Sequence, residues 1–131
     1  MSSRRYRNFN EYIEAVKELI TSYDDVIAVA ELEEFEVTLN EGFIRGTIIF
    51  IDGSRLHFLE YIRIINNIPI KLRYRYHYED VEGNMVFRYD NAPHHRNIAT
   101  FPHHKHVGDN VSPSREPSLS TVLEEVVLMI R

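Results

Sequence analysis

The spacing of hydrophobic residues near the start of the chain predicts a helix over residues 9–23. Large side chains recur there every three or four positions, at Tyr12, Val16, Leu19, Ile20 and Tyr23. Asn8 precedes this segment and Glu11 follows three residues later, a spacing typical of a capping box. A second helix is predicted near the other end of the chain, capped by Ser118 or Ser120. Its apolar side consists of Leu119, Val122, Leu123, Val126 and Ile130.

Between the two helices the period of the pattern falls to two, which is typical of β-strands. Residues 26–40 alternate in this way and predict one long strand. Asp52-Gly53 separates two further alternating runs and is a strong hairpin signal. A two-residue turn at this point would place Arg45 opposite Glu60. We therefore interpret Glu60 first as half of a structural ion pair, and second as a residue that orients a catalytic partner.

Another hairpin is predicted around Gly83, between residues 70–80 and 84–91. The first of these runs alternates strictly, with Leu72, Tyr74, Tyr76 and Tyr78 on one face. Its other face carries Lys71, Arg73, Arg75 and His77. Pairing the tyrosines with the aromatic residues of the second run puts Arg88 and Asp90 opposite the basic residues. We expect the tyrosines in the core and the charged face at the surface.

After Asp90 the pattern loses its period, and four prolines interrupt the stretch of residues 91–117. A segment of that length with little regular structure is typical of a functional loop. The chain is therefore expected to form a single α+β domain over residues 1–131. Its elements would be an N-terminal helix, a mostly antiparallel sheet of about five strands, a long His/Pro-rich loop and a C-terminal helix.

Composition narrows the function classes. The chain has no cysteine, which excludes disulfides, thiolate metal sites and cysteine nucleophiles. No apolar run is long enough to span a membrane, and no apolar segment follows the basic N-terminus, so we expect a cytoplasmic protein. The net charge of −5 hides an asymmetry, since residues 11–41 hold ten acidic and one basic residue, whereas residues 42–115 hold seven acidic and ten basic. The middle of the chain could attract phosphate, although two solvated faces of opposite charge would give the same pattern.

Five of the seven histidines fall in the proline-rich stretch, at His94, His95, His103, His104 and His106. One interpretation is a metal-dependent hydrolase or a metal-binding protein, because neutral imidazole binds zinc, copper, nickel and iron. On an extended chain His104 and His106 point to the same side, and Asp109 or Asp90 could complete the set. His103 and His104 point to opposite sides and cannot easily share an ion.

A second interpretation is proton transfer to a phosphodiester, which requires no cofactor. RNA cleavage without a metal needs a base, an acid and fixed cations. The candidates for acid–base and orienting roles are His77, His95, His103, His104, Glu60 and Asp90, with His57 as a weaker one. The candidates for holding phosphate are Arg73, Arg75, Arg88 and Lys105. A third interpretation is a non-catalytic module that binds nucleic acid or a partner protein. In that case an acidic segment would dock a basic partner or protect against self-binding; it consists of Glu31, Glu33, Glu34 and Glu36.

Several consecutive segments carry a resemblance to a known family. They are DGSRLHFLEY, RYRYHYED, VFRYDNAPHH, TFPHHKHVGD and PSREPSL, within residues 49–122. On these segments the chain resembles the TumE family of toxin components from toxin–antitoxin pairs. The resemblance implies a small cytoplasmic toxin that is encoded beside an antitoxin protein, and this antitoxin binds and neutralises the toxin. Toxins of this kind block growth by attacking translation, most often by cutting RNA. An exposed sheet edge could also pair two copies of the chain.

Overall fold

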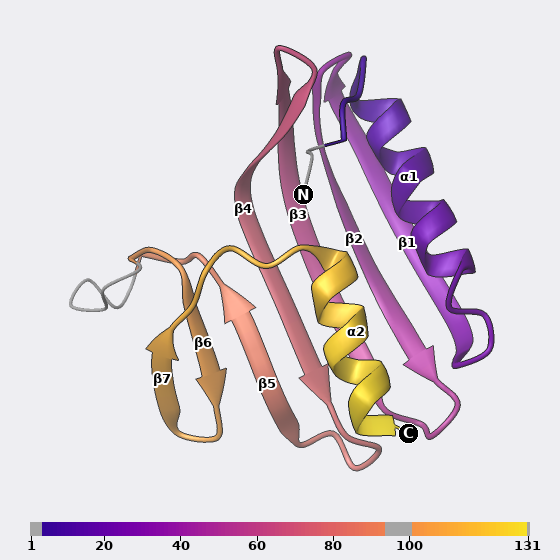
Figure 1. Ribbon diagram of the computed structural model, residues 1–131, viewed down its shortest axis with the longest axis vertical. Helices are drawn as coiled ribbons and strands as arrows, with labels where there is room; N and C mark the ends of the chain where they lie inside the picture. Colours follow the sequence, from indigo (N-terminus) through magenta and orange to yellow (C-terminus); the bar gives the residue numbers. More distant parts are fainter. Residues whose placement is uncertain (1–3, 94–100, 131) are drawn as a thin grey trace.

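The computed structural model describes residues 4–93 and 101–130. These residues form an antiparallel sheet of seven strands in sequence order, with one helix at each end of the chain (Figure 1). The strands are β1 (Ile27–Thr38), β2 (Glu41–Phe50), β3 (Arg55–Ile65), β4 (Ile68–Glu79), β5 (Met85–Asp90), β6 (His104–Val107) and β7 (Asn110–Pro113). The helices are α1 (Phe9–Thr21) and α2 (Leu119–Ile130). The predicted α+β class and both helices are confirmed, whereas the predicted count of about five strands is wrong.

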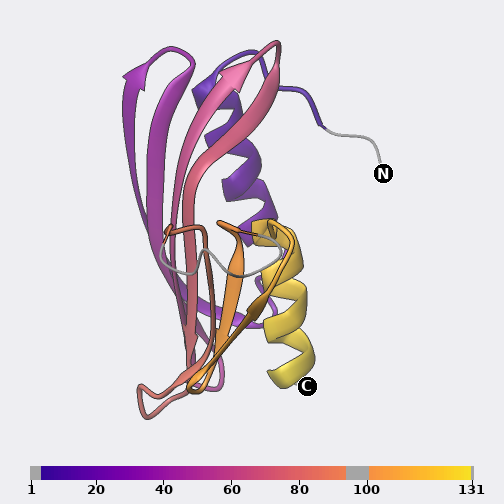
Figure 2. The same cartoon turned by 90° about the vertical axis from the view of Figure 1, so that its left-hand side faces the viewer.

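Both helices lie on the same side of the sheet, as Figure 2 shows in side view. α1 packs against β1, β2 and β3, while α2 packs against β4. The hydrophobic core fills the space between the helices and the sheet, and it includes the predicted row of Tyr74, Tyr76 and Tyr78. We call the opposite surface of the sheet the open face, because no helix among the described residues covers it. No described helix is both long and apolar enough to cross a bilayer.

The hairpin between β2 and β3 differs from the predicted one by a single residue. The Phe50 amide donates a hydrogen bond to the Ser54 carbonyl oxygen at 2.9 Å, which closes a loop of three residues rather than two. Gly53 takes the left-handed conformation in this loop, with φ of +85°. Three-residue hairpin loops commonly place a left-handed glycine at their last position. The Asp-Gly signal thus marked the turn correctly, but the predicted register is wrong.

The register change removes the predicted pair between Arg45 and Glu60. Arg45 lies opposite Leu59 instead, and its guanidinium is 3.0 Å from the Glu33 carboxylate. Glu60 lies opposite Ile44 and is completely buried. A shift of one residue along a strand moves a side chain to the other face of the sheet, and this explains why the two residues do not meet.

Buried Glu60 has other partners. Its carboxylate accepts hydrogen bonds from the hydroxyl groups of Tyr12 and Tyr76, and the Lys71 ammonium lies 3.5 Å away. Lys71 also donates to the Tyr76 hydroxyl at 2.6 Å and to the Pro117 carbonyl at 2.8 Å. Burial, reinforced by the Glu60 charge, raises the pKa of both tyrosines well above the ordinary value, so they remain hydrogen-bond donors. This cluster connects α1, β3, β4 and the residue two positions before α2.

Lys71 reaches the core because β4 contains a bulge. Tyr61 and Ile62 of β3 pair with Arg73 and Lys71, which leaves Leu72 as an extra residue. One extra residue reverses the alternation of side chains beyond it. The prediction that Lys71 shares a face with Arg73 is therefore wrong.

The proline-rich segment is more regular than predicted. β6 pairs with β5, and a two-residue connection that includes Gly108 at φ of +57° leads into β7. These two short strands extend the sheet from five to seven. Their sequence has few β-branched residues, so their order comes from pairing with the edge of β5 rather than from local preference.

Candidate functional site

Two rows of side chains cross the open face from β2 to β6. The register makes neighbours of Arg45, Leu59, Arg75, Asp90 and His104 in one row. The adjacent row consists of Thr47, His57, His77, Arg88 and His106. Because directly opposed residues of an antiparallel pair share a face, these rows bring basic and imidazole side chains together. The prediction that Arg73, Arg75, His77, Arg88 and Asp90 share one surface agrees with this register.

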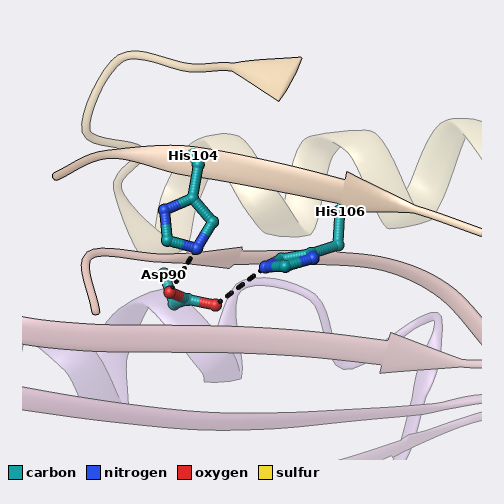
Figure 3. A group of neighbouring side chains, drawn as sticks. All are labelled: Asp90, His104 and His106. Carbon is teal, nitrogen blue, oxygen red and sulfur yellow. Dashed lines mark ion pairs between the residues drawn. The ribbon is translucent and has the colours of Figure 1, made fainter. Parts of the chain in front are cut away.

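The most compact group in the rows is formed by Asp90, His104 and His106 (Figure 3). Both histidines point from β6 toward the carboxylate at the end of β5. The Nε2 of His104 is 2.7 Å from Oδ1 of Asp90, and the Nε2 of His106 is 3.5 Å from Oδ2. Asp90 and His104 are buried, whereas the side chain of His106 is 22% exposed. Of the two histidines, His106 is therefore the one that solvent or a ligand can reach.

Hydrogen bonds from the backbone hold this group in place. The Nδ1 of His104 lies 2.9 Å from the Pro102 carbonyl, an acceptor, so this nitrogen must carry a proton. The Ala92 amide donates to Oδ1 of Asp90 at 3.0 Å. His104 is thus fixed between a carbonyl and a carboxylate, which makes it a support for Asp90.

The group borders a cavity of about 220 Å³. The cavity is lined by Leu59, Arg73, Tyr74, Arg75, Arg88, Asp90, Ala92, His104 and His106. A second cavity of about 530 Å³ adjoins it and shares Leu59 and Arg75. Three arginines thus face a single carboxylate in the smaller cavity, an arrangement that attracts an anion.

Two buried polar atoms in the second row lack hydrogen-bond partners within residues 4–93 and 101–130. They are Nε of Arg88 and Nδ1 of His77. Buried polar atoms are seldom left unsatisfied, and such atoms are often completed by water or a ligand. The two residues are neighbours on β4 and β5.

His77 also belongs to a second group with His57 and Glu79. The Nε2 of His77 lies 3.7 Å from one carboxylate oxygen of Glu79, and the Nε2 of His57 lies 3.0 Å from the other. Burial and the nearby Arg88 charge lower the pKa of His77, which favours the neutral ring. Glu79 was missed by sequence reasoning, although the alternation of β4 places it in phase with Arg75 and His77.

Several predicted site residues lie elsewhere. His103 is on the helix side, where Nδ1 is 2.9 Å from the Tyr74 hydroxyl. Lys105 is on the same side, with its ammonium 2.8 Å from the carboxylate of Glu125 in α2. Asp109 lies in the connection between β6 and β7, whereas Asp90 accompanies His104 and His106.

Other predicted site residues are not near the cavity or not described. Glu60 is buried in the core cluster. His95, together with His94, lies outside the described residues. The cavity therefore retains, from the predicted set, His104, Asp90, Arg73, Arg75 and Arg88.

Comparison with known proteins gives one match. The model of a family described as Toxin TumE matches residues 14–131. No curated protein and no solved structure matches the chain. The match covers both open-face rows and agrees with the resemblance found in the sequence.

Proposed function

The chain belongs to the TumE family of toxins, and from this premise we propose that it cuts RNA on the open face, along the second row beside the smaller cavity, without a metal or other cofactor. The family suggests an antitoxin protein as its partner. We propose further that the toxin acts in the cytoplasm, where its RNA substrate is translated. The observation that carries the proposal is the row His77–Arg88–His106, in which one cation separates two imidazoles.

The row has the parts that phosphodiester cleavage requires. His77 and His106 lie on strands two apart, so their backbones are separated by about 10 Å. A phosphate between them would meet the Arg88 guanidinium, which can donate hydrogen bonds to the phosphate oxygens. Arg75 in the adjoining row, and Arg73 beyond it, add positive charge around the developing phosphorane.

The proton transfers follow from the environments of the two rings. His77 favours its neutral form and accepts the proton of the RNA 2′-hydroxyl, while the 2′-oxygen attacks phosphorus. His106, near the Asp90 carboxylate, gives a proton to the departing 5′-oxygen. The products are a 2′,3′-cyclic phosphate and a free 5′-hydroxyl. Asp90 orients His106, and buried His104 holds Asp90.

The test uses purified, untagged protein and total RNA in EDTA. Wild type is expected to cut the RNA, while His77→Ala and His106→Ala are expected to lose at least about a hundredfold in rate, the usual contribution of a positioned acid or base. His103→Gln is the matched control, because it alters another histidine of the same chain that lies on the helix side. It should retain activity.

Two results would contradict the proposal. RNA that stays intact in every buffer, with binding that weakens steeply as salt rises, would favour the non-catalytic binding module. Loss of activity in His103→Gln with activity retained in the other two variants would move the chemistry off the open face.

A further inference from the structure

We infer that Asp90, His104 and His106 also form a site for one divalent transition-metal ion of the zinc type, and that an ion bound there blocks RNA cleavage. The second half of this inference rests on the proposed function, whereas the first half stands on geometry alone. The ligand atoms of these three residues all lie within 4.8 Å of one another, which is close enough for them to hold one ion. Among the described residues, no other group of three such side chains meets this limit.

The distances within the group match a metal site. Zinc binds imidazole nitrogen and carboxylate oxygen at about 2.0–2.2 Å, so ligand atoms of a tetrahedral site lie about 3.4 Å apart. The two nitrogen–oxygen distances to Asp90, 2.7 Å and 3.5 Å, bracket that value. Small side-chain rotations would therefore bring the three ligands to an ion.

Hydrogen bonds between the backbone and both His104 and Asp90 orient these two side chains as metal ligands. The Pro102 carbonyl holds the Nδ1 hydrogen of His104, which turns Nε2 toward Asp90. The Ala92 amide holds the carboxylate. Contacts of this type fix the ring orientation of metal-bound histidines and favour binding through Nε2. Two imidazoles and one carboxylate suit zinc and its neighbours, whereas calcium and magnesium prefer oxygen ligands.

The group of His57, His77 and Glu79 offers a comparison on the same face. It has the same types of ligand, but the two imidazole ring centres are 6.1 Å apart, against 4.8 Å for His104 and His106. We therefore expect one ion per chain.

Metal binding and the proposed cleavage compete for the same atoms. An ion on Nε2 of His106 occupies the lone pair that a proton holds in the imidazolium form, so the ring can no longer act as a general acid. The ion therefore converts a proton donor into a ligand, and cleavage stops until the metal is removed.

The test begins with untagged protein stripped of metal with EDTA and then dialysed. Titration with Zn²⁺ in a calorimeter, and with Co²⁺ followed by its visible absorption, should give one ion per chain. Asp90→Asn and His106→Ala should weaken binding at least about tenfold, while the control His57→Ala should leave it unchanged. Circular dichroism checks the fold of each variant; the accessible His106 is chosen because replacing buried His104 could unfold the chain.

Absence of stoichiometric binding, or binding unchanged in both Asp90→Asn and His106→Ala, overturns the site. Equal loss in His57→Ala also overturns it, because the ion would then lie elsewhere. If Zn²⁺ binds at the site but RNA is cut at the same rate, the blocking role is wrong. If RNA is not cut even in EDTA while Zn²⁺ binds as described, the proposed function fails and the metal site stands.

Discussion

Replacing Lys71 with methionine tests the core cluster around Glu60. Methionine keeps an unbranched chain of similar length but removes the charge, so Glu60 loses the ammonium 3.5 Å from its carboxylate. The side chain of Lys71 is 9% exposed and that of Glu60 is 0% exposed, and water cannot easily replace the missing partner. The carboxylate keeps two hydrogen bonds from Tyr12 and Tyr76.

The size of the effect follows from two limits. At an effective dielectric constant of about 20, charges 3.5 Å apart attract by about 5 kcal/mol. The carboxylate can escape this loss by taking up a proton, which costs an ordinary solvated carboxyl about 3.7 kcal/mol at pH 7. We therefore expect Lys71→Met to lower the free energy of unfolding by about 3 kcal/mol at pH 7, within the range for a broken buried pair.

The pH dependence gives the sharper check. In the variant, the folded state holds a proton on Glu60 that the unfolded state releases, so its stability falls as pH rises. At pH 5 the proton costs only about 1 kcal/mol, and the difference from wild type should shrink accordingly. Urea unfolding at pH 5 and pH 7, followed by circular dichroism, measures both values.

A double variant separates charge from packing. Lys71→Met with Glu60→Gln has no buried charge left, and the amide can still bond both tyrosine hydroxyls. It should recover about 2 kcal/mol relative to Lys71→Met alone. Equal stability of the single and double variants, or the same loss at both pH values, would refute the reasoning, because the cluster would then act through packing alone.

Three further changes test other parts of the fold. In Gly42→Ala the new Cβ would lie 2.4 Å from the Phe35 carbonyl oxygen, so thermal unfolding should show a loss of about 2–3 kcal/mol. Ser118→Ala removes the hydroxyl that caps α2 and should cost about 1 kcal/mol in urea unfolding. Burial and the Arg88 charge lower the pKa of His77 in the folded state, so the unfolded chain binds the proton more readily. Wild type should therefore lose stability as the pH falls from 7.5 to 5.5, whereas His77→Gln should not show this loss. Urea unfolding at each pH measures the difference.

Local signals predicted much of this fold because they act within one element. The Asn8 side chain accepts a hydrogen bond from the Glu11 amide at 2.9 Å, as the capping pattern indicated. Alternation also placed Arg88 and Asp90 on the same face as Arg75 and His77, and the pairing of β4 with β5 agrees with it. In both cases the deciding contacts lie within one turn or one hairpin, so the sequence pattern alone could find them.

The errors arose where one residue decides the geometry. Asp-Gly occurs in hairpin loops of two and of three residues, and the choice between them put Ile44 rather than Arg45 opposite Glu60. The bulge at Leu72 turned Lys71 inward to meet it. The alternation within one strand revealed neither extra residue, because each one shows only in how two strands pair.

The same reasoning explains why His106 was assigned only to a metal set. Its place beside Arg88 depends on β6 joining the edge of β5, and β6 has little strand preference of its own. The opposite side of β6 supplies the missing stability: Lys105 contacts Glu125 of α2 at 2.8 Å, and the Tyr89 hydroxyl donates to the same carboxylate at 2.6 Å. Lys105, predicted to hold phosphate, instead ties β6 to the helix layer. Because side chains alternate along a strand, the contact that directs Lys105 toward α2 also leaves the next residue, His106, on the open face.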